Sequence, residues 1–318
     1  MPAHYFFIVN PHAGGDSVAA TWPKIKTILN KKHVAYVPYF THYVGHAVAI
    51  TQFLLTYIMN NSLDNPVIIA VGGDGTLHEI INGCMNYFKD HPGEPEVPVA
   101  FLPVGSGNDF ARAANISLKW ETALKDILTN YSCNRVTIGH YIDIHNHKEG
   151  YCTNVFGIGF DAKIVYTANH SLAKKNNFFG KFSYLLALLR VLFKFKQFPV
   201  RYQVKAKQGL IKNIFLLTTT NIPYFGGGVR IAPQASIFKN NLDLVLIEKP
   251  NLGQILHIIA LLLLGQHYRL SYVHHYSVDK FTVFSKTKNF CQIDGETGLH
   301  SGYEVEYDTR SYLFWLGD

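Results

Sequence analysis

Three glycines and one carboxylate mark the point where an apolar stretch gives way to a helical pattern, in the run Gly72-Gly73-Asp74-Gly75-Thr76. Glycine lets backbone N–H groups approach an anion closely, and the N-terminus of the following helix adds partial positive charge. Phosphates do not need an aspartate among such donors, whereas a metal ion that bridges them does. We therefore interpret this run as a nucleotide phosphate-binding loop, in preference to a tight turn that Asp74 merely caps.

A second glycine loop follows the next apolar stretch and carries Gly105, Ser106, Asn108, Asp109 and Arg112. It supplies further backbone amides, a second carboxylate and a guanidinium. Arg112 stands three residues after Asp109, so the two share a face if the segment is helical. A local ion pair worth about 0.3–0.5 kcal/mol would also explain that spacing. Both explanations stay open.

Three further candidates are weaker. Asn10 opens a turn-rich loop between an expected strand and an expected helix. Thr41 ends the next expected strand, where it could contact a nucleotide or serve only as a cap. Late in the chain, Asp294-Gly295-Glu296 places two carboxylates around a glycine, which suits metal binding or general-base duty. Asp-Gly is also an ordinary turn signal.

Two familiar nucleotide motifs, the P-loop and the GxGxxG dinucleotide fingerprint, do not occur in the sequence. His78-Glu79 looks like the start of a zinc protease motif. Asn82 stands where that motif needs its second histidine, so a zinc protease is excluded.

Rigid elements must hold the glycine loops, and the first third of the chain alternates strand and helix signals. Strands are expected at 5–9, 33–40, 66–71 and 97–102, and helices at 18–31, 45–59 and 77–88. Such alternation predicts a parallel, doubly wound α/β sheet. Ligands bind beyond the carboxyl ends of the strands in these folds, and both glycine loops fall there.

Strand-like stretches dominate after about residue 130. They lie at 135–138, 151–156, 200–205, 211–220, 242–247, 278–285 and 289–293, with helical candidates at 178–195 and 252–264. Antiparallel strands in a sandwich-like second domain are the simplest account. We therefore predict an α/β nucleotide-binding domain at 1–130 and a β-rich substrate domain at 131–305.

The composition indicates a folded protein with anionic partners. Its 318 residues, 48% hydrophobic and 16% charged, are enough for two buried cores. A net charge of +7 suits phosphates or acidic lipid headgroups. The four cysteines are scattered, as for thiols in a reducing compartment, and we expect no signal peptide or membrane span. A basic amphipathic stretch at 178–198 could lie on a membrane or pack on the core.

Together these motifs resemble those of the bacterial diacylglycerol kinase-like lipid kinases, which share a catalytic domain with sphingosine kinases. The resemblance rests on Asn10-Pro11, on Thr41 with the following 45–47, and on 72–83, 103–112 and 294–296, in family order. It implies an N-terminal α/β nucleotide domain, a β-rich C-terminal domain and a site between them. It also implies that the tail, about 306–318, returns to the first domain.

The same resemblance implies the nucleotide-binding residues Asn10, Thr41, Gly72, Gly73, Asp74, Gly75, Thr76, Gly105, Ser106 and Asn108. Asp74 and Asp109 would bind the catalytic Mg²⁺ of ATP, and Arg112 would support the phosphate charge. Glu296 would be the general base that takes the proton from a lipid hydroxyl as the hydroxyl attacks the γ-phosphorus.

Two positions depart from the family pattern. Members commonly carry an aspartate where this chain has Thr137, so the acidic network toward the catalytic metal is thinner. Some members hold a structural Mg²⁺ through an aspartate in an Asp-Gly turn, where this chain has Asn240, a weaker and neutral ligand. We expect no structural metal there unless Asp243 substitutes.

We therefore predict an ATP:lipid phosphotransferase, with diacylglycerol as the default acceptor and ATP and Mg²⁺ as cofactors. A lipid- or nucleotide-binding regulator without turnover is one alternative, motivated by Thr137 and Asn240. An NAD kinase, which shares the GGDGT run at 72–76, is the other. Expected partners are the lipid substrate and the membrane surface, with no nucleic acid, and a homodimer stays open. The expected location is the cytoplasm, including the inner face of the membrane.

Overall fold

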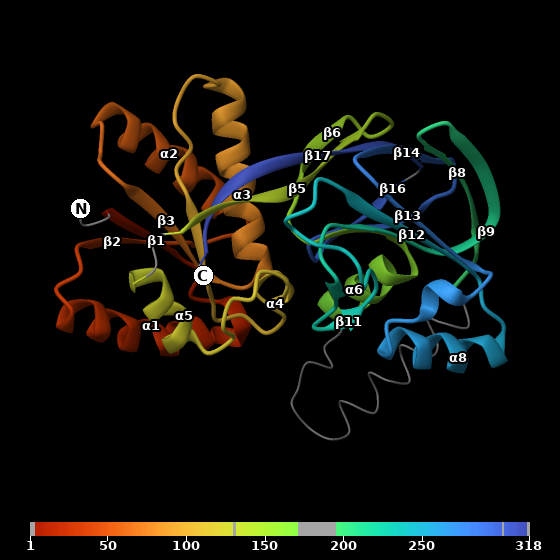
Figure 1. Ribbon diagram of the computed structural model, residues 1–318, viewed down its shortest axis with the longest axis horizontal. Helices are drawn as coiled ribbons and strands as arrows, with labels where there is room; N and C mark the ends of the chain where they lie inside the picture. The colour runs from red at the N-terminus through yellow and green to blue at the C-terminus, as the bar shows by residue number, and fades with distance from the viewer. Residues whose placement is uncertain (1–3, 130–131, 171–194, 301, 317–318) are drawn as a thin grey trace.

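The computed structural model describes residues 4–129, 132–170, 195–300 and 302–316 (Figure 1). The helix expected at 178–195 lies outside these residues except for Phe195. The helices are α1 (Ala13–Lys31), α2 (His46–Asn60), α3 (Asp74–Asp90), α4 (Asp109–Ala113), α5 (Trp120–Thr129), α6 (Phe160–His170) and α8 (Leu252–Leu263), with a 3₁₀ turn at His267–Arg269. No helix within the described ranges combines the length and apolar character that crossing a membrane requires.

The described residues contain seventeen strands. They are β1 (His4–Val9), β2 (Tyr36–Phe40), β3 (Pro66–Gly72), β4 (Val99–Pro103), β5 (Cys133–Asp143), β6 (Lys148–Cys152), β7 (Val155–Gly159), β8 (Phe198–Val204), β9 (Lys207–Thr220), β10 (Tyr224–Phe225), β11 (Val229–Arg230), β12 (Leu242–Glu248), β13 (Val273–Val278), β14 (Lys280–Ser285), β15 (Asn289–Ile293), β16 (Glu296–His300) and β17 (Tyr303–Trp315).

The N-terminal domain is a parallel sheet in the order β2-β1-β3-β4 with helices on both faces. Side chains alternate along β1: Phe6 and Ile8 join the core under α2 and α3, while Phe7 and Val9 join the core under α1 and α5 (Figure 1). The strand order reverses between β1 and β3, so their carboxyl ends form the crevice at which such sheets bind ligands. The predicted doubly wound α/β domain is confirmed.

The C-terminal domain is built from antiparallel strands, and its inner side chains form a core of its own. The predicted β-rich second domain is confirmed. The long strands β5 and β17 pair with each other and run between the two domains (Figure 1). Near its end β17 lies parallel to β4, with Phe314 opposite Val99, so the two sheets are continuous.

Three expected strands have the wrong extent. The strand expected at 135–138 is the longer β5, Cys133–Asp143. The stretch 151–156 is divided between β6 and β7, because the backbone N–H groups of Thr153, Asn154 and Val155 turn toward the carboxylate of Asp294. The stretch 278–285 is divided as well, because the chain bends at Asp279, where β13, paired with β12, ends and β14, paired with β8 and β17, begins. Helix α6 was not expected, since its sequence has no strong helical pattern.

Candidate active site

The two glycine loops pack backbone against backbone at the carboxyl ends of β3 and β4. The carbonyl of Gly72 accepts hydrogen bonds from the N–H groups of Val104 and Gly105, at 2.8 and 2.9 Å. A Cβ on Gly105 would lie 2.4 Å from the Cα of Gly73, and a Cβ on Gly72 would lie 2.4 Å from Oγ1 of Thr76. Glycine is therefore required at these two positions by close approach.

The first loop joins the same crevice. The side-chain amide of Asn10 donates to Oγ1 of Thr76 at 3.1 Å. The N–H of Thr41 donates to the carbonyl of Val9 at 2.9 Å, which places the end of β2 beside the end of β1. Gly75 and Ser106 are exposed at the rim. The structure thus brings the predicted nucleotide-binding residues to one edge of the sheet, and their contacts with a nucleotide stay a prediction.

Asp74 and Asp109 join the two loops. The Asp74 carboxylate accepts the N–H groups of Asp109 and Phe110, each at 3.1 Å, and so caps α4. Phe110 is buried and stacks on Phe314 of β17, with ring centroids 5.0 Å apart. The packing of this ring fixes the start of α4, and with it the position of Asp109.

The Asp109 carboxylate lies among opposing influences. Burial raises its pKa, and the nearby Asp74 carboxylate raises it further, while the N–H of Gly227 and the guanidinium of Arg112 act in the opposite direction. Arg112 lies 3.5 Å from Asp109 and also donates to the Gly107 carbonyl. A divalent cation would relieve the repulsion between the two carboxylates. Two carboxylates suit Mg²⁺, which commonly takes one or two of them together with substrate phosphates, so the pair fits the expected ion.

A third glycine loop was missed by the sequence analysis. Gly226, Gly227 and Gly228 connect β10 to β11, all with positive φ, and the N–H of Gly227 donates to Asp109 at 2.8 Å. Three consecutive glycines between short strands were the available signal. The loop brings backbone N–H groups of the C-terminal domain to the glycine loops of the first.

The late Asp-Gly-Glu run forms the hairpin between β15 and β16. Asp294 and Gly295 have φ values of 47° and 95°, and positive φ at both central residues is what a type I′ turn requires. The Asp294 carboxylate accepts the N–H groups of Thr153, Asn154 and Val155, at 2.7 to 2.9 Å, and the Thr153 hydroxyl. Of the two carboxylates, Asp294 therefore anchors the turn, and the predicted role of Glu296 as general base stays a prediction.

His78 supplies a further hydrogen bond to Asp294. Its Nδ1 lies 2.7 Å from the Asp294 carboxylate. Burial alone would raise the pKa of Asp294, but His78 and the N–H groups of Val155 and Thr153 hold it below its ordinary value. An ionised carboxylate can only accept, so Nδ1 of His78 carries the proton. His78 was considered only as part of a failed zinc motif, and this role was missed.

The other residues of that failed motif tie α3 to its neighbours. The Glu79 carboxylate accepts the N–H groups of Gly45 and Ala47 at the start of α2, at 2.8 and 3.0 Å. Asn82 exchanges two hydrogen bonds with the backbone of Tyr151 on β6. Helix α3 thus begins within the glycine loop at 72–76 and contacts α2, β6 and the hairpin of Glu296.

Glu296 is exposed at the start of β16 and lines a cavity of about 190 Å³. His78, Tyr141, Asp143 and Lys148 line the same cavity. Because His78 follows Asp74 by one helical turn, a rise of about 6 Å, the cavity lies close to the phosphate loop. A hydroxyl in the cavity would have a carboxylate beside it.

The expected absence of a structural Mg²⁺ at the Asn240 turn stays a prediction, since Oδ2 of Asp243 is buried without a hydrogen-bond partner among the described residues. The Thr137 hydroxyl donates to the carbonyl of Lys239 at 2.9 Å, and the Thr137 N–H donates to the carbonyl of Ile237 at 2.7 Å. Asp243 lies within β12, where its carboxylate is engaged by His275 at 2.5 Å. No cluster of three or more His, Cys, Asp or Glu able to hold a metal occurs in the described part of the chain.

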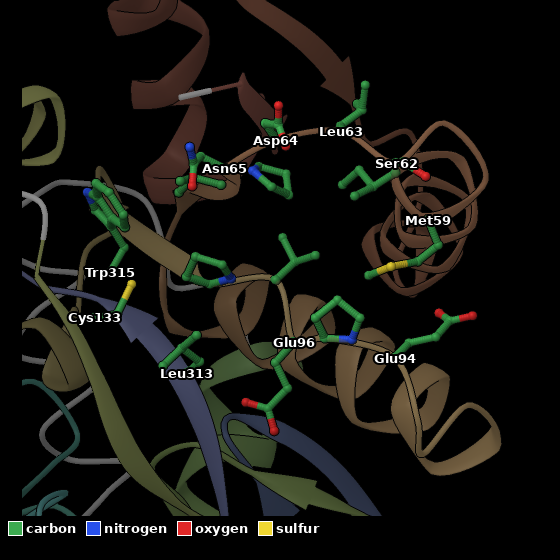
Figure 2. Close-up of a pocket in the computed structure, with 16 residues that line it drawn as sticks. Met59, Ser62, Leu63, Asp64, Asn65, Glu94, Glu96, Cys133, Leu313 and Trp315 are labelled. Carbon is green, nitrogen blue, oxygen red and sulfur yellow. The ribbon is translucent and has the colours of Figure 1, made fainter. Parts of the chain in front are cut away.

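A larger cavity lies at the amino-terminal ends of the strands of the N-terminal sheet. Figure 2 shows this cavity of about 890 Å³, with Met59, Leu63, Leu313 and Trp315 among its lining. It adjoins Pro66, at the amino-terminal end of β3. The glycine loops and the carboxylate pair lie at the other ends of the strands, and the candidate active site is the one at those ends.

Comparison with known families decides the classification. Residues 4–140 match the diacylglycerol kinase catalytic domain, and residues 154–307 match the YegS C-terminal NAD kinase beta sandwich-like domain. The chain belongs to the diacylglycerol kinase-like family of lipid kinases. The resemblance seen in the sequence motifs is confirmed.

Relatives extend over nearly the whole chain. It is 29% identical to a diacylglycerol kinase of Staphylococcus saprophyticus, over 92% of this chain and 88% of the relative. It is 28% identical to a diacylglycerol kinase of Bacillus subtilis, over 73% of this chain and 71% of that relative. A crystal structure of a diacylglycerol kinase from Bacillus anthracis covers 99% of this chain and 97% of its own, with a TM-score of 0.66 and 17% identity. That structure supports the fold.

Proposed function

We propose that this lipid kinase family member transfers the γ-phosphoryl group of ATP to a lipid hydroxyl, with a diacylglycerol-like molecule as the acceptor. The observation that carries the proposal is the path along α3. Asp74 begins the helix beside Asp109, and one turn later His78 contacts the hairpin that bears Glu296. A phosphate-binding edge and a carboxylate for the acceptor are thus joined through a single rigid element.

Each group has a distinct part in the transfer. The amides of the two glycine loops would bind the phosphates, and Asp74 and Asp109 would hold Mg²⁺, which neutralises charge on the transferred group. Glu296 takes the proton of the acceptor hydroxyl as the new O–P bond forms and the bond to the ADP oxygen breaks. Catalysis then depends on positioning and charge more than on covalent chemistry.

The acceptor would be reached at a membrane surface. Diacylglycerol-like lipids reside in bilayers, and the net charge of +7 would draw the protein to acidic headgroups. We place this contact at the inner face of the membrane, where ATP is present. Cosedimentation with anionic vesicles, compared with neutral ones, measures it. Equal binding to both would contradict the electrostatic contribution.

The first test removes the charge of Asp74. Asp74→Asn keeps the shape and the cap on α4 in part, but it lowers the charge that holds the cation. We expect turnover of diacylglycerol in mixed micelles with ATP and Mg²⁺ to fall by about 10²–10³-fold. Phosphatidic acid formed from radiolabelled ATP is the measured product.

Asp90→Asn is the matched control, because Asp90 lies exposed at the other end of α3. It should retain wild-type turnover. If Asp74→Asn is as active as Asp90→Asn, the assigned role is wrong. If the wild type phosphorylates NAD and no lipid, the NAD kinase alternative replaces the proposal.

A further inference from the structure

The hairpin of Glu296 has an unusual anchor. The Asp294 carboxylate is wholly enclosed and accepts five hydrogen bonds, four from Thr153, Asn154 and Val155 and one from His78. The first four come from the C-terminal domain itself, since they belong to the loop between β6 and β7 and to the first residue of β7. The bond from His78 is different, because it comes from α3 of the nucleotide-binding domain.

That contact bears directly on Glu296. Glu296 follows Asp294 by two residues and is exposed, so the backbone of the turn determines where its carboxylate lies. His78 is 13% exposed at its side chain and lines the same cavity as Glu296. Moving Asp294 relative to α3 therefore moves Glu296 relative to Asp74, which sits on the same helix.

We propose that His78 is a positioning residue that, as an imidazolium, holds the Asp294 turn against α3 and thereby sets Glu296 opposite the phosphate-binding loops. The inference rests on the proposed lipid kinase activity. His78 forms no bond to the reacting atoms and acts through Asp294.

The charged surroundings of His78 favour its protonated form. Burial alone would lower the pKa of His78, but Asp294, Glu296 and Glu79 raise it above the ordinary value. Across the cavity lie Lys148, Asp143 and Tyr141. A group whose pKa is raised on folding contributes stability below its unfolded pKa, about 6.5, and that stability is lost as pH rises through the folded pKa. The hold on the hairpin should weaken in the same direction.

Two variants separate the hydrogen bond from the charge. His78→Phe removes both, and a displaced Glu296 should lower kcat for lipid phosphorylation about 10–100-fold. KM for ATP should change less than about twofold, because the glycine loops are untouched. His78→Gln keeps an N–H donor but has neither the charge nor a titrating ring, so near pH 6.5 its kcat should lie between those of the wild type and His78→Phe.

The dependence of kcat on pH distinguishes this role from a merely structural contact, which would leave that dependence unchanged. In the wild type, kcat should fall as pH rises above about 6.5 through the pKa of His78, and this limb should be absent in His78→Gln. The control is His91→Gln. His91 follows the last residue of α3 and contacts the Tyr87 carbonyl, so this variant should keep the wild-type profile.

An NMR titration and a stability measurement complete the test, and neither depends on turnover. The NMR titration of the His78 ring, assigned by its loss in His78→Gln, should give a pKa above 6.5. The difference in Tm between wild type and His78→Gln should be largest at low pH and shrink as pH rises. An ordinary pKa, or kcat unchanged in His78→Phe with an active wild type, overturns the inference. A wild type that phosphorylates no lipid overturns the proposed function instead.

Discussion

Single residues shape the candidate active site mainly through close approach and hydrogen bonding. Gly105 touches the backbone of Gly73, and Asp74 caps α4 while lying beside Asp109. Asp74 is therefore a cap of α4, not of the turn in which it stands, and it is also a candidate metal ligand. Side chains that contact backbone in this way shape the loops before any ligand binds.

Replacing Gly105 with alanine tests the contact between the loops. The new Cβ would meet the Cα of Gly73, which cannot move without separating the two loops. We expect a loss of about 1–3 kcal/mol in stability and weaker ATP binding, measured by thermal unfolding and calorimetry. Gly93→Ala, where a Cβ meets nothing within 4 Å, is the control. Equal Tm values for the two variants would contradict the described packing.

The strands and the first three helices of the N-terminal domain could be predicted from local sequence to within a few residues, whereas α5 was not expected. Its parallel strands are buried on both faces and read as continuous apolar runs, as at 66–71 against the observed Pro66–Gly72. The glycine loops follow those strands directly, so sequence also placed them at one edge of the sheet. The roles assigned to them in binding ATP and Mg²⁺ stay predictions.

Elements of the C-terminal domain depend on contacts that local sequence does not display. The expected strand at 151–156 is interrupted because Asp294, about 140 residues away, binds three of its N–H groups. The contacts of His78 and Gly227 are equally remote, with Asp294 and Asp109 as their partners. Residue types suggested chemistry at each position, but only the fold shows which of them meet.

The whole molecule is held together by strands that pass between its two domains. β17 pairs with β14 and β5 and then reaches β4, where Phe314 is fully buried against Phe110. This arrangement makes the position of α4, and so of Asp109, depend on the end of the chain.

Truncating Phe314 tests that dependence. Phe314→Ala removes a buried ring and should lower the free energy of unfolding by about 3–5 kcal/mol, seen in denaturant unfolding. Phe238→Ala, at a ring that is 55% exposed, should change stability by less than about 0.5 kcal/mol. If Phe314→Ala lowers the free energy of unfolding no more than Phe238→Ala does, β17 does not support the N-terminal domain.

The central claim is that Glu296 serves the acceptor hydroxyl while the glycine loops bind ATP. The most direct measurement is diacylglycerol phosphorylation by Glu296→Gln, paired with ATP affinity and with Glu121→Gln as the exposed control on α5. We predict a loss of turnover of about 10²–10⁴-fold in Glu296→Gln, with ATP affinity unchanged and Glu121→Gln fully active. Wild-type turnover in Glu296→Gln would contradict the account.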